Sequence, residues 1–434
     1  MTHARAQGRR ILLVNLDVPF PRAVYRQLWM LRDNDIVVTA CAVEKEFLGY
    51  VCEILGLDEN TVSLMVHDAL LTDEVLASPE LAQAIRNELA PVDRPEECVL
   101  EPCMLTEGVS RLARALGIPL GTMLRFGSEY GSDLLNRKSH FRQLAVGAGI
   151  PVPEGSIVHD ASALACALRD SLPATGTVIV KRDNDRGGRG NAAVTTKAVD
   201  CVAGTFVTYR AAGELHIQAK ALWEELTDSV NTALVVEEYH DHEVSFYQEF
   251  LIHDDGRFTF VDSGTADRRR QGEPPAMEWV GLHLPARLPG NELVEATLYC
   301  SRLVELCARI GYRGYINVDG IVTPDGRMFF NEVNARLGGG LSLHLIGRAL
   351  LGDGFASRHH LMSLRDVPPG DFAVLLETLA DSGLGFSPDS KEGVVVVGYD
   401  PSRQRTVECL LLAADPDATK RLERELRTAI GQKG

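Results

Sequence analysis

The residues that could do chemistry are concentrated in one predicted hairpin about three quarters of the way along the chain. Tyr315 to Val322 has the apolar pattern of a buried strand, Pro324 to Gly326 has turn chemistry, and Met328 to Val333 returns as a second strand. Both strands carry polar side chains. The stretch from Gly311 to Gly340 is therefore predicted to be a β-hairpin that presents acids.

Three oxygen-bearing side chains of this hairpin are spaced to converge. Asp319 lies inside the first strand, and Glu332 and Asn334 close the second strand two residues apart. Side chains at that spacing point to one face of a strand. Hard oxygen ligands of this kind suit Mg²⁺, whose other ligands are water and substrate phosphates. The alternative is a surface hairpin with solvated acids. The metal site is favoured because acids on an apolar strand pair are costly unless they are paired or bind a metal.

An arginine and three glycines follow the predicted metal ligands. The guanidinium of Arg336 is planar and permanently charged, so it can hold a phosphoryl or carboxylate group with two hydrogen bonds. Gly338 to Gly340 allow the backbone to approach a ligand closely. The alternative is that these glycines have only a structural role and begin a helix.

Together these residues resemble the C-terminal signature of the ATP-grasp superfamily. In that family an acid on one strand and a Glu-x-Asn on the next hold the metal, which implies Asp319, Glu332 and Asn334 as metal ligands. The resemblance implies ATP as the nucleotide and Mg²⁺ as the metal. It also requires further nucleotide-binding parts upstream.

Two upstream lysines supply candidate phosphate contacts. Lys138 lies early in a predicted helix from Asn136, which breaks at Gly147 to Gly149. Lys181 ends an apolar strand and precedes a glycine-rich loop containing Gly187, Gly188 and Gly190. Each alone could be a solvated charge or a surface turn. The family resemblance implies that both lysines and the loop bind nucleotide phosphates.

A predicted strand from Leu234 to Tyr239 then ends in polar residues. Its backbone could face a flat base, and the resemblance implies that the adenine lies against the hinge formed by Glu237, Glu238, Tyr239 and His240. The same resemblance gives Glu243 the role of holding the ribose hydroxyls. The histidine pair at 240 and 242 lacks a third nearby ligand, so exposed histidines are expected instead of a metal site.

Arginines also occur in a stretch without strand or helix periodicity. Residues 263–281 contain Arg268, Arg269 and Arg270 together with glycines and prolines, and they are predicted to be a loop. The arginines are either solvated charges or a clamp for a carboxylate or phosphate. The clamp is favoured because strands of the same predicted sheet flank them.

Composition limits the classes of partner. The 434 residues contain 60 acids and 44 Lys and Arg, giving a formal net charge of -16. This balance argues against nucleic-acid and acidic-membrane partners. The nine cysteines contain no Cys-x-x-Cys pair, and no apolar run has the length of a membrane span. A cytoplasmic protein with reduced thiols is expected.

The pattern of elements predicts an α/β protein with an ATP-grasp fold. Apolar runs at Ile11 to Leu16 and Ile36 to Val43 alternate with helical spacing, which favours a parallel sheet, and no Gly-x-Gly-x-x-Gly follows the first strand. The predicted domains are an N-terminal α/β pre-ATP-grasp domain at 1–130, a nucleotide lid and hinge at 131–240, a metal and catalytic subdomain at 241–365, and a small α/β C-terminal domain at 366–434.

The resemblance implies a ligase that activates a carboxylate as an acyl phosphate and joins it to an amine. Within the superfamily the layout is similar to that of peptide ligases of antibiotic biosynthesis, which implies an unusual amino acid and a peptide acceptor as substrates. Arg336 and Arg268 would be the catalytic arginines. Two alternatives stay open, a carboxylase that uses bicarbonate and a non-catalytic nucleotide-binding regulator. A homodimer is expected only because symmetric dimers are common.

Overall fold

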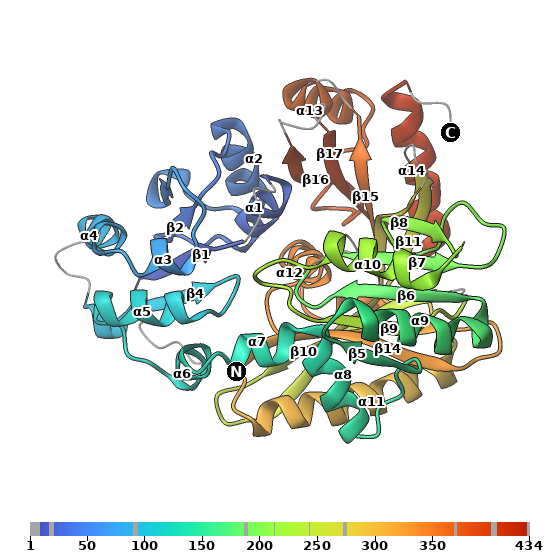
Figure 1. The fold of residues 1–434 in the computed structure, drawn as a ribbon. Coiled ribbons are helices and arrows are strands. Elements are labelled where there is room, and N and C mark those ends of the chain that lie inside the picture. The colour runs from blue at the N-terminus through green and yellow to red at the C-terminus, as the bar shows by residue number, and fades with distance from the viewer. Residues whose placement is uncertain are drawn as a thin grey trace.

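The computed structural model describes residues 9–16, 21–89, 94–185, 190–211, 213–242, 244–271, 276–368, 371–400 and 406–431. These residues form three sheets with helices packed on their faces (Figure 1). Within the described ranges, no helix has the length and apolar character that crossing a membrane requires.

The N-terminal sheet is parallel, in the order β3-β2-β1-β4. Its strands are β1 (Arg10–Val14), β2 (Ile36–Thr39), β3 (Ser63–Val66) and β4 (Val99–Pro102). Its helices are α1 (Pro21–Gln27), α2 (Lys45–Leu55), α3 (Asp73–Leu76), α4 (Pro79–Glu88), α5 (Glu107–Leu116), α6 (Thr122–Ser128) and α7 (Gly131–Asn136). The predicted parallel α/β unit is confirmed.

Local sequence explains where these elements begin and end. Helix α5, for example, begins after Thr106, whose hydroxyl accepts a hydrogen bond from the Val109 N–H. It ends at Gly117, whose φ of 79° is the left-handed conformation that glycine favours. The apolar run of β1 is fully buried because helices cover both faces of the sheet.

The second sheet has five strands in the order β5-β9-β6-β7-β8. Its strands are β5 (Gly155–Val158), β6 (Thr177–Arg182), β7 (Asn191–Thr195), β8 (Val207–Arg210) and β9 (Leu234–Glu238). The associated helices are α8 (Lys138–Gly147), α9 (Ala161–Thr175) and α10 (Leu215–Leu226). In Figure 1 this sheet and its two long helices form the green unit beside the third sheet.

The third sheet is antiparallel, in the order β14-β13-β10-β11-β12-β15-β17-β16. Its strands are β10 (Val244–Ile252), β11 (Phe258–Gln271), β12 (Ala276–Leu284), β13 (Gly314–Val322), β14 (Met328–Asn334), β15 (His360–Val367), β16 (Gly393–Asp400) and β17 (Thr406–Ala413). The helices are α11 (Gly290–Arg309), α12 (Gly339–Leu351), α13 (Phe372–Asp381) and α14 (Pro416–Ala429).

Two findings on this sheet differ from the sequence analysis. The predicted arginine loop is wrong, because residues 263–271 continue β11 and residues 276–281 belong to β12. Charged side chains and glycines removed the apolar alternation that normally marks a strand. The predicted C-terminal unit at 366–434 contributes strands β16 and β17, which extend the third sheet through β15 and do not form a sheet of their own.

A buried ion pair joins the N-terminal unit to these C-terminal strands. Nε of Arg26, on α1, donates to Oε2 of Glu408 at 2.7 Å, and Nη2 pairs with the other carboxylate oxygen. The exposed fractions are 6% for Arg26 and 0% for Glu408. The guanidinium also lies against the ring of Trp279, 5.6 Å from its centroid.

We expect Glu408→Gln to lower the free energy of unfolding by about 3 kcal/mol, because the charge of Arg26 stays buried without a counter-ion. Replacing both partners, as Arg26→Met with Glu408→Leu, should restore most of the loss. Urea unfolding measures both. The matched control is Glu305→Gln in the exposed Arg309 pair on α11, where a change below about 0.5 kcal/mol is expected. A Glu408 variant as stable as that control would contradict the prediction.

Candidate nucleotide and metal site

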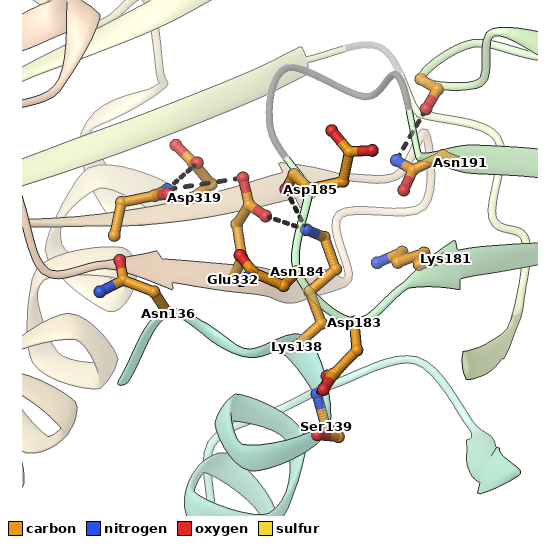
Figure 2. Close-up of polar contacts among 12 residues, drawn as sticks. Asn136, Lys138, Ser139, Lys181, Asp183, Asn184, Asp185, Asn191, Asp319 and Glu332 are labelled. Atoms are coloured by element: carbon orange, nitrogen blue, oxygen red, sulfur yellow. Dashed lines mark hydrogen bonds and ion pairs between the residues drawn. The ribbon is translucent and has the colours of Figure 1, made fainter. Parts of the chain in front are cut away.

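The predicted hairpin of β13 and β14 brings its polar side chains together. Asp319 lies opposite Glu332 and Asn317 lies opposite Asn334 in the antiparallel register. Nδ2 of Asn334 is 2.8 Å from Oδ2 of Asp319 and 3.3 Å from Oδ1 of Asn317. Figure 2 shows the Asp319 and Glu332 carboxylates next to each other on neighbouring strands.

The two carboxylates influence each other's protonation. Burial raises the pKa of Asp319 well above its usual value, and the nearby Glu332 charge raises it further. Burial also acts to raise the pKa of Glu332, but the charges of Lys138, Arg336 and Lys181 outweigh it, so this pKa is lowered. An added cation beside the pair would favour the ionised form of Asp319, which burial and the Glu332 charge disfavour.

The donor set of the hairpin fits Mg²⁺. Asp319 and Glu332 supply two carboxylates, and Asn334 supplies an amide whose oxygen and nitrogen exchange places when the side chain flips. Among the described residues, no three His, Cys, Asp or Glu side chains are grouped as a metal site. A metal at this hairpin therefore depends on the amide of Asn334 as well as on the two acids.

Lys138 connects the lid to the hairpin. It is the first residue of α8, and its Nζ lies 3.2 Å from Oε2 of Glu332 and donates to the Asp185 carbonyl at 2.7 Å (Figure 2). Asp183 positions the start of this helix, because its carbonyl accepts from the Lys138 N–H at 3.0 Å and its Oδ1 accepts from the Ser139 N–H at 2.9 Å. The sequence analysis did not single out Asp183.

Lys181 belongs to a second buried cluster. Its Nζ lies 2.6 Å from Oε2 of Glu237, and Nη1 of Arg142 lies 2.9 Å from the other oxygen of that carboxylate. All three side chains are buried. The charge of Lys181 also acts on Glu332. Lys138 on α8 and Lys181 on β6 therefore both lie within electrostatic reach of the hairpin.

The hinge differs in part from its prediction. The Glu237 side chain is a counter-ion, and its strand β9 is hydrogen-bonded to β5 on one side and β6 on the other. The N–H of Glu238 donates to the Glu154 carbonyl and that of Tyr239 donates to Thr177. Backbone N–H groups of these two residues are therefore already used within the protein. Sequence reasoning missed this because β5 was not predicted.

The hinge histidines are half-buried, so the expectation of exposed histidines is wrong. The ring of His240 stacks on Phe329 of β14, with centroids 4.5 Å apart, and burial lowers the pKa of His240. Nε2 of His242 lies 3.3 Å from Nη1 of Arg268. Both contacts connect the hinge to the third sheet.

Arg268 is held on β11 and faces the site. Burial lowers its pKa, and the charges of Tyr239, Asp319 and Glu332 oppose that shift, which places all three groups within electrostatic reach. Arg268 is thus near the hairpin, although it projects from a strand and not from the predicted loop. The side chains of Arg269 and Arg270 lie outside the described part of the structure.

Arg336 is oriented by Asn136, a residue at the end of α7 that the sequence analysis treated only as a helix start. Nη1 of Arg336 donates to Oδ1 of Asn136 at 2.6 Å, and the same oxygen accepts from the Ala335 N–H at 3.0 Å. Nδ2 of Asn136 donates to the Ser132 carbonyl at 2.9 Å. A single amide therefore fixes the segment that follows the predicted metal ligands.

The three glycines that begin α12 make room for side chains of this chain. A Cβ at Gly340 would lie 2.4 Å from the Tyr247 ring, and one at Gly339 would lie 2.7 Å from Nη1 of Arg26. The close approach predicted for Gly338 to Gly340 exists, but the structure shows it toward protein side chains.

Some predicted residues cannot be located. Gly187, Gly188 and Glu243 lie outside the described residues. Gly190 is described, and its carbonyl accepts from the Arg182 N–H at 2.8 Å, which closes the hairpin between β6 and β7. A Cβ at Gly190 would lie 2.6 Å from Cβ of Asp185, so this position requires glycine.

A further buried carboxylate lies behind the hairpin. Glu249 on β10 is fully buried, and Nδ2 of Asn317 donates to its Oε1 at 3.1 Å. Burial raises the pKa of Glu249 to about 7, despite the hydrogen bonds from Asn317 and from the Leu341 backbone. Nothing in the local sequence distinguishes this glutamate from other strand residues.

The raised pKa of Glu249 predicts a pH effect on stability. The folded protein holds the proton more tightly than the unfolded chain, so this stabilisation is complete below the unfolded pKa of 4.5 and is lost as the pH rises through about 7. We expect Glu249→Gln to reduce the fall in unfolding free energy over this range. Urea midpoints measured from pH 4.5 to 8 test it, and an unchanged pH profile would contradict it.

Comparisons with known proteins agree with this architecture. The Pre ATP-grasp domain profile matches residues 24–118, and the PGM1 C-terminal domain profile matches residues 374–426. The comparison with curated proteins gives no match.

Solved structures with related folds cover nearly the whole chain. They include N5-carboxyaminoimidazole ribonucleotide synthetase as its ADP complex, with 12% identity, a TM-score of 0.60, and coverage of 97% of this chain and 96% of that chain. The biotin carboxylase domain of Hydrogenobacter thermophilus 2-oxoglutarate carboxylase, with MgADP and bicarbonate, has 15% identity, a TM-score of 0.62, and coverage of 97% and 90%. The L-amino acid ligase of Bacillus licheniformis has 13% identity, a TM-score of 0.58, and 99% coverage of both chains.

These identities establish the fold and leave the reaction open. The parallel N-terminal sheet, the five-stranded lid and the antiparallel third sheet follow one another in chain order, as predicted. The chain therefore has the α/β ATP-grasp fold, with a pre-ATP-grasp domain before it and a C-terminal domain after it.

Proposed function

We propose that this protein is an ATP-dependent ligase that joins a carboxylate to an amine. The observation that carries the proposal is the meeting of Lys138 and the Asp319 and Glu332 carboxylates, with Arg336 held beside them by Asn136. Two cations and a pair of carboxylates lie where the lid meets the hairpin. Such a set can bind a nucleoside triphosphate, with the cations on the phosphates and the carboxylates on the metal. The solved ligases and carboxylases of this fold support ATP and Mg²⁺ as cosubstrate and cofactor.

The proposed reaction has two steps. The substrate carboxylate attacks the γ-phosphorus of ATP, which forms an acyl phosphate and releases ADP. The amine then attacks the carbonyl carbon, and phosphate leaves as the amide bond forms. This chemistry depends on positioning and on charge neutralisation, so no serine, cysteine or histidine nucleophile is required.

Each charged residue has a proposed role. Asp319, Glu332 and Asn334 would hold Mg²⁺, which neutralises phosphate charge during transfer. Lys138 and Lys181 bind phosphate oxygens, with Glu237 and Arg142 holding Lys181 in position. Arg336 stabilises the acyl phosphate, and Arg268 orients the carboxylate from the neighbouring strand.

The finer proposal concerns the substrates. The PGM1 C-terminal domain profile, which matches residues 374–426, supports the resemblance to the peptide ligase of pheganomycin biosynthesis. We infer that the carboxylate belongs to a nonproteinogenic amino acid and that the amine is the N-terminus of a peptide.

Substrate-dependent ADP release tests the function. The protein is assayed with ATP, Mg²⁺, pooled amino acids and short peptides, and products are identified by mass. A product equal in mass to acid plus amine minus water is the expected result. ADP release that requires bicarbonate and no amine would favour a carboxylase, and no release with any acid would favour a nucleotide-binding regulator. Either outcome would overturn the proposal that this protein is a ligase.

A further inference from the structure

A row of polar side chains crosses three neighbouring strands and ends at the candidate metal site. In the antiparallel register Glu249 of β10 lies opposite Asn317 of β13, and Asn317 lies opposite Asn334 of β14. Residues directly opposite each other in a sheet project from the same face, so these three side chains follow one another across it. We call them the Glu249 row. Of its members, only Asn334 belongs to the predicted site.

The hydrogen bonds within the Glu249 row run in one direction. Nδ2 of Asn334 donates to Oδ1 of Asn317 at 3.3 Å, and Nδ2 of Asn317 donates to Oε1 of Glu249 at 3.1 Å. An accepting carboxyl oxygen fixes which end of the Asn317 amide faces it, because only the amide nitrogen can donate. The oxygen of Asn317 is thereby turned toward Asn334. The carboxyl group of Glu249 thus sets the orientation of an amide on the next strand.

The Glu249 row is buried and is anchored at one end. The exposed fractions are 0% for Glu249, 7% for Asn317 and 8% for Asn334. The Leu341 backbone, at the start of α12, hydrogen-bonds the Glu249 carboxyl, and a Cβ at Gly338 would lie 3.3 Å from its Oε1. Removing polar groups from water costs free energy that apolar side chains at 249 and 317 would not incur. Stability alone therefore explains the row poorly, and its other end lies among the proposed metal ligands.

The Asn334 amide can serve a cation only through its oxygen. In the structure its nitrogen donates to Oδ2 of Asp319 at 2.8 Å as well as to Asn317. A cation held by Asp319 competes with this N–H for the same carboxylate, because both are attracted to its lone pairs. Oδ1 of Asn317 then remains as an acceptor for the Asn334 nitrogen, and it is not itself a proposed ligand. An amide whose nitrogen is bound in this way keeps its oxygen for the metal.

We propose that Glu249 and Asn317 are positioning residues of the metal site, which hold an acceptor for the Asn334 nitrogen so that the Asn334 oxygen is presented to Mg²⁺. This inference rests on the proposed function for the metal ligands themselves. Hydrogen-bond partners orient metal ligands, and their loss weakens metal binding about 10- to 100-fold. Glu249 can act in either protonation state, since a neutral carboxylic acid keeps a carbonyl oxygen that accepts. The side chain in Glu249→Gln keeps such an oxygen too.

Binding of Mn²⁺, as a spectroscopic probe for Mg²⁺, tests the inference without turnover. The full chain is titrated with Mn²⁺ in the presence of ADP, and free Mn²⁺ is followed by electron paramagnetic resonance. We expect Glu249→Met and Asn317→Leu each to raise the Kd for Mn²⁺ about tenfold, and Glu249→Gln to stay within about twofold of the wild type. The variant with both Glu249→Met and Asn317→Leu should bind no more weakly than Asn317→Leu alone, because Glu249 acts through Asn317.

Gln248 supplies the matched control. It is the neighbouring residue of β10, it is also fully buried, and its Nε2 donates to Oγ1 of Thr297 on α11 at 2.9 Å. Successive residues of a strand point to opposite faces, so Gln248→Met removes a buried amide on the side away from the metal ligands. This variant should keep the wild-type Kd for Mn²⁺. Urea unfolding checks that each variant is folded, and Asn317→Leu carries the same test if Glu249→Met does not fold.

Wild-type Mn²⁺ binding in Asn317→Leu or in a folded Glu249→Met would overturn the inference. A loss in Glu249→Gln as large as in Glu249→Met, or an equal loss in Gln248→Met, would also overturn it, because either result indicates general damage to β10. If the unmodified protein binds no Mn²⁺ with ADP, the inference fails together with the proposed metal site. If the expected Mn²⁺ affinities are found but no amide product forms, the inference stands and the proposed ligase activity fails.

Discussion

Glu332→Gln is expected to lower ADP formation about a thousandfold, a loss of roughly 4 kcal/mol of transition-state stabilisation. The substitution removes one of the two carboxylates proposed to hold Mg²⁺ and also removes the charge that pairs with Lys138 at 3.2 Å. Asp319 then remains as the only carboxylate of the proposed metal site, so half of the negative charge offered to Mg²⁺ is lost. Steady-state ADP release with the identified substrates measures the effect.

A matched control for Glu332 lies in the same hairpin. Asp325 is at the exposed turn, where it pairs with Arg327 at 2.8 Å, and Asp325→Asn should leave turnover within about twofold because exposed ion pairs contribute little. Titration with Mg²⁺ adds a second readout, because the Glu332 variant should need more metal to reach its own maximum. If Glu332→Gln kept the turnover and the metal requirement of the wild type, the hairpin would have no role in the reaction.

Arg336→Ala is expected to lower kcat about a hundredfold, while KM for ATP changes little. The guanidinium is proposed to stabilise charge that develops as the acyl phosphate forms, and groups of that kind affect the rate more than ground-state binding. Asn136→Ala should cause a smaller loss in the same direction, because it releases the arginine from its 2.6 Å hydrogen bond without removing the charge. Measurement of kcat and KM separately for ATP and for the acid distinguishes these effects.

The control for Arg336 is Arg327→Ala, which removes an exposed arginine of the same hairpin and should leave kcat nearly unchanged. A hundredfold loss in both variants would indicate damage to the hairpin and not a role of Arg336. Normal turnover with unchanged affinity for the acid in Arg336→Ala would contradict the proposed role.

The sequence predicted the elements whose patterns are local. The hairpin of β13 and β14 and the strand that ends near Lys181 were predicted because apolar periodicity and turn residues mark them directly. Residues that act through long-range contacts were not found. In the sequence, Glu237 looks like an ordinary polar residue at the end of a strand. In the fold, its carboxylate forms ion pairs with both Lys181 and Arg142.

Two further differences have the same origin. The arginines at 268–270 interrupt the apolar alternation, so a long strand was read as a loop, although pairing with β12 stabilises it. Asn136 and Glu249 look unremarkable in the sequence because their importance comes from partners 200 and 68 residues away, Arg336 and Asn317. The roles assigned to the predicted site residues stay predictions until nucleotide binding is measured.

Transfer of ¹⁸O tests the central claim most directly. The acid substrate is labelled with ¹⁸O in its carboxylate, and the phosphate released during amide formation is analysed by mass. Formation of an acyl phosphate at the Lys138 and Glu332 site predicts one ¹⁸O atom in inorganic phosphate for each amide bond, together with ADP. Unlabelled phosphate, or label recovered in AMP, would contradict it.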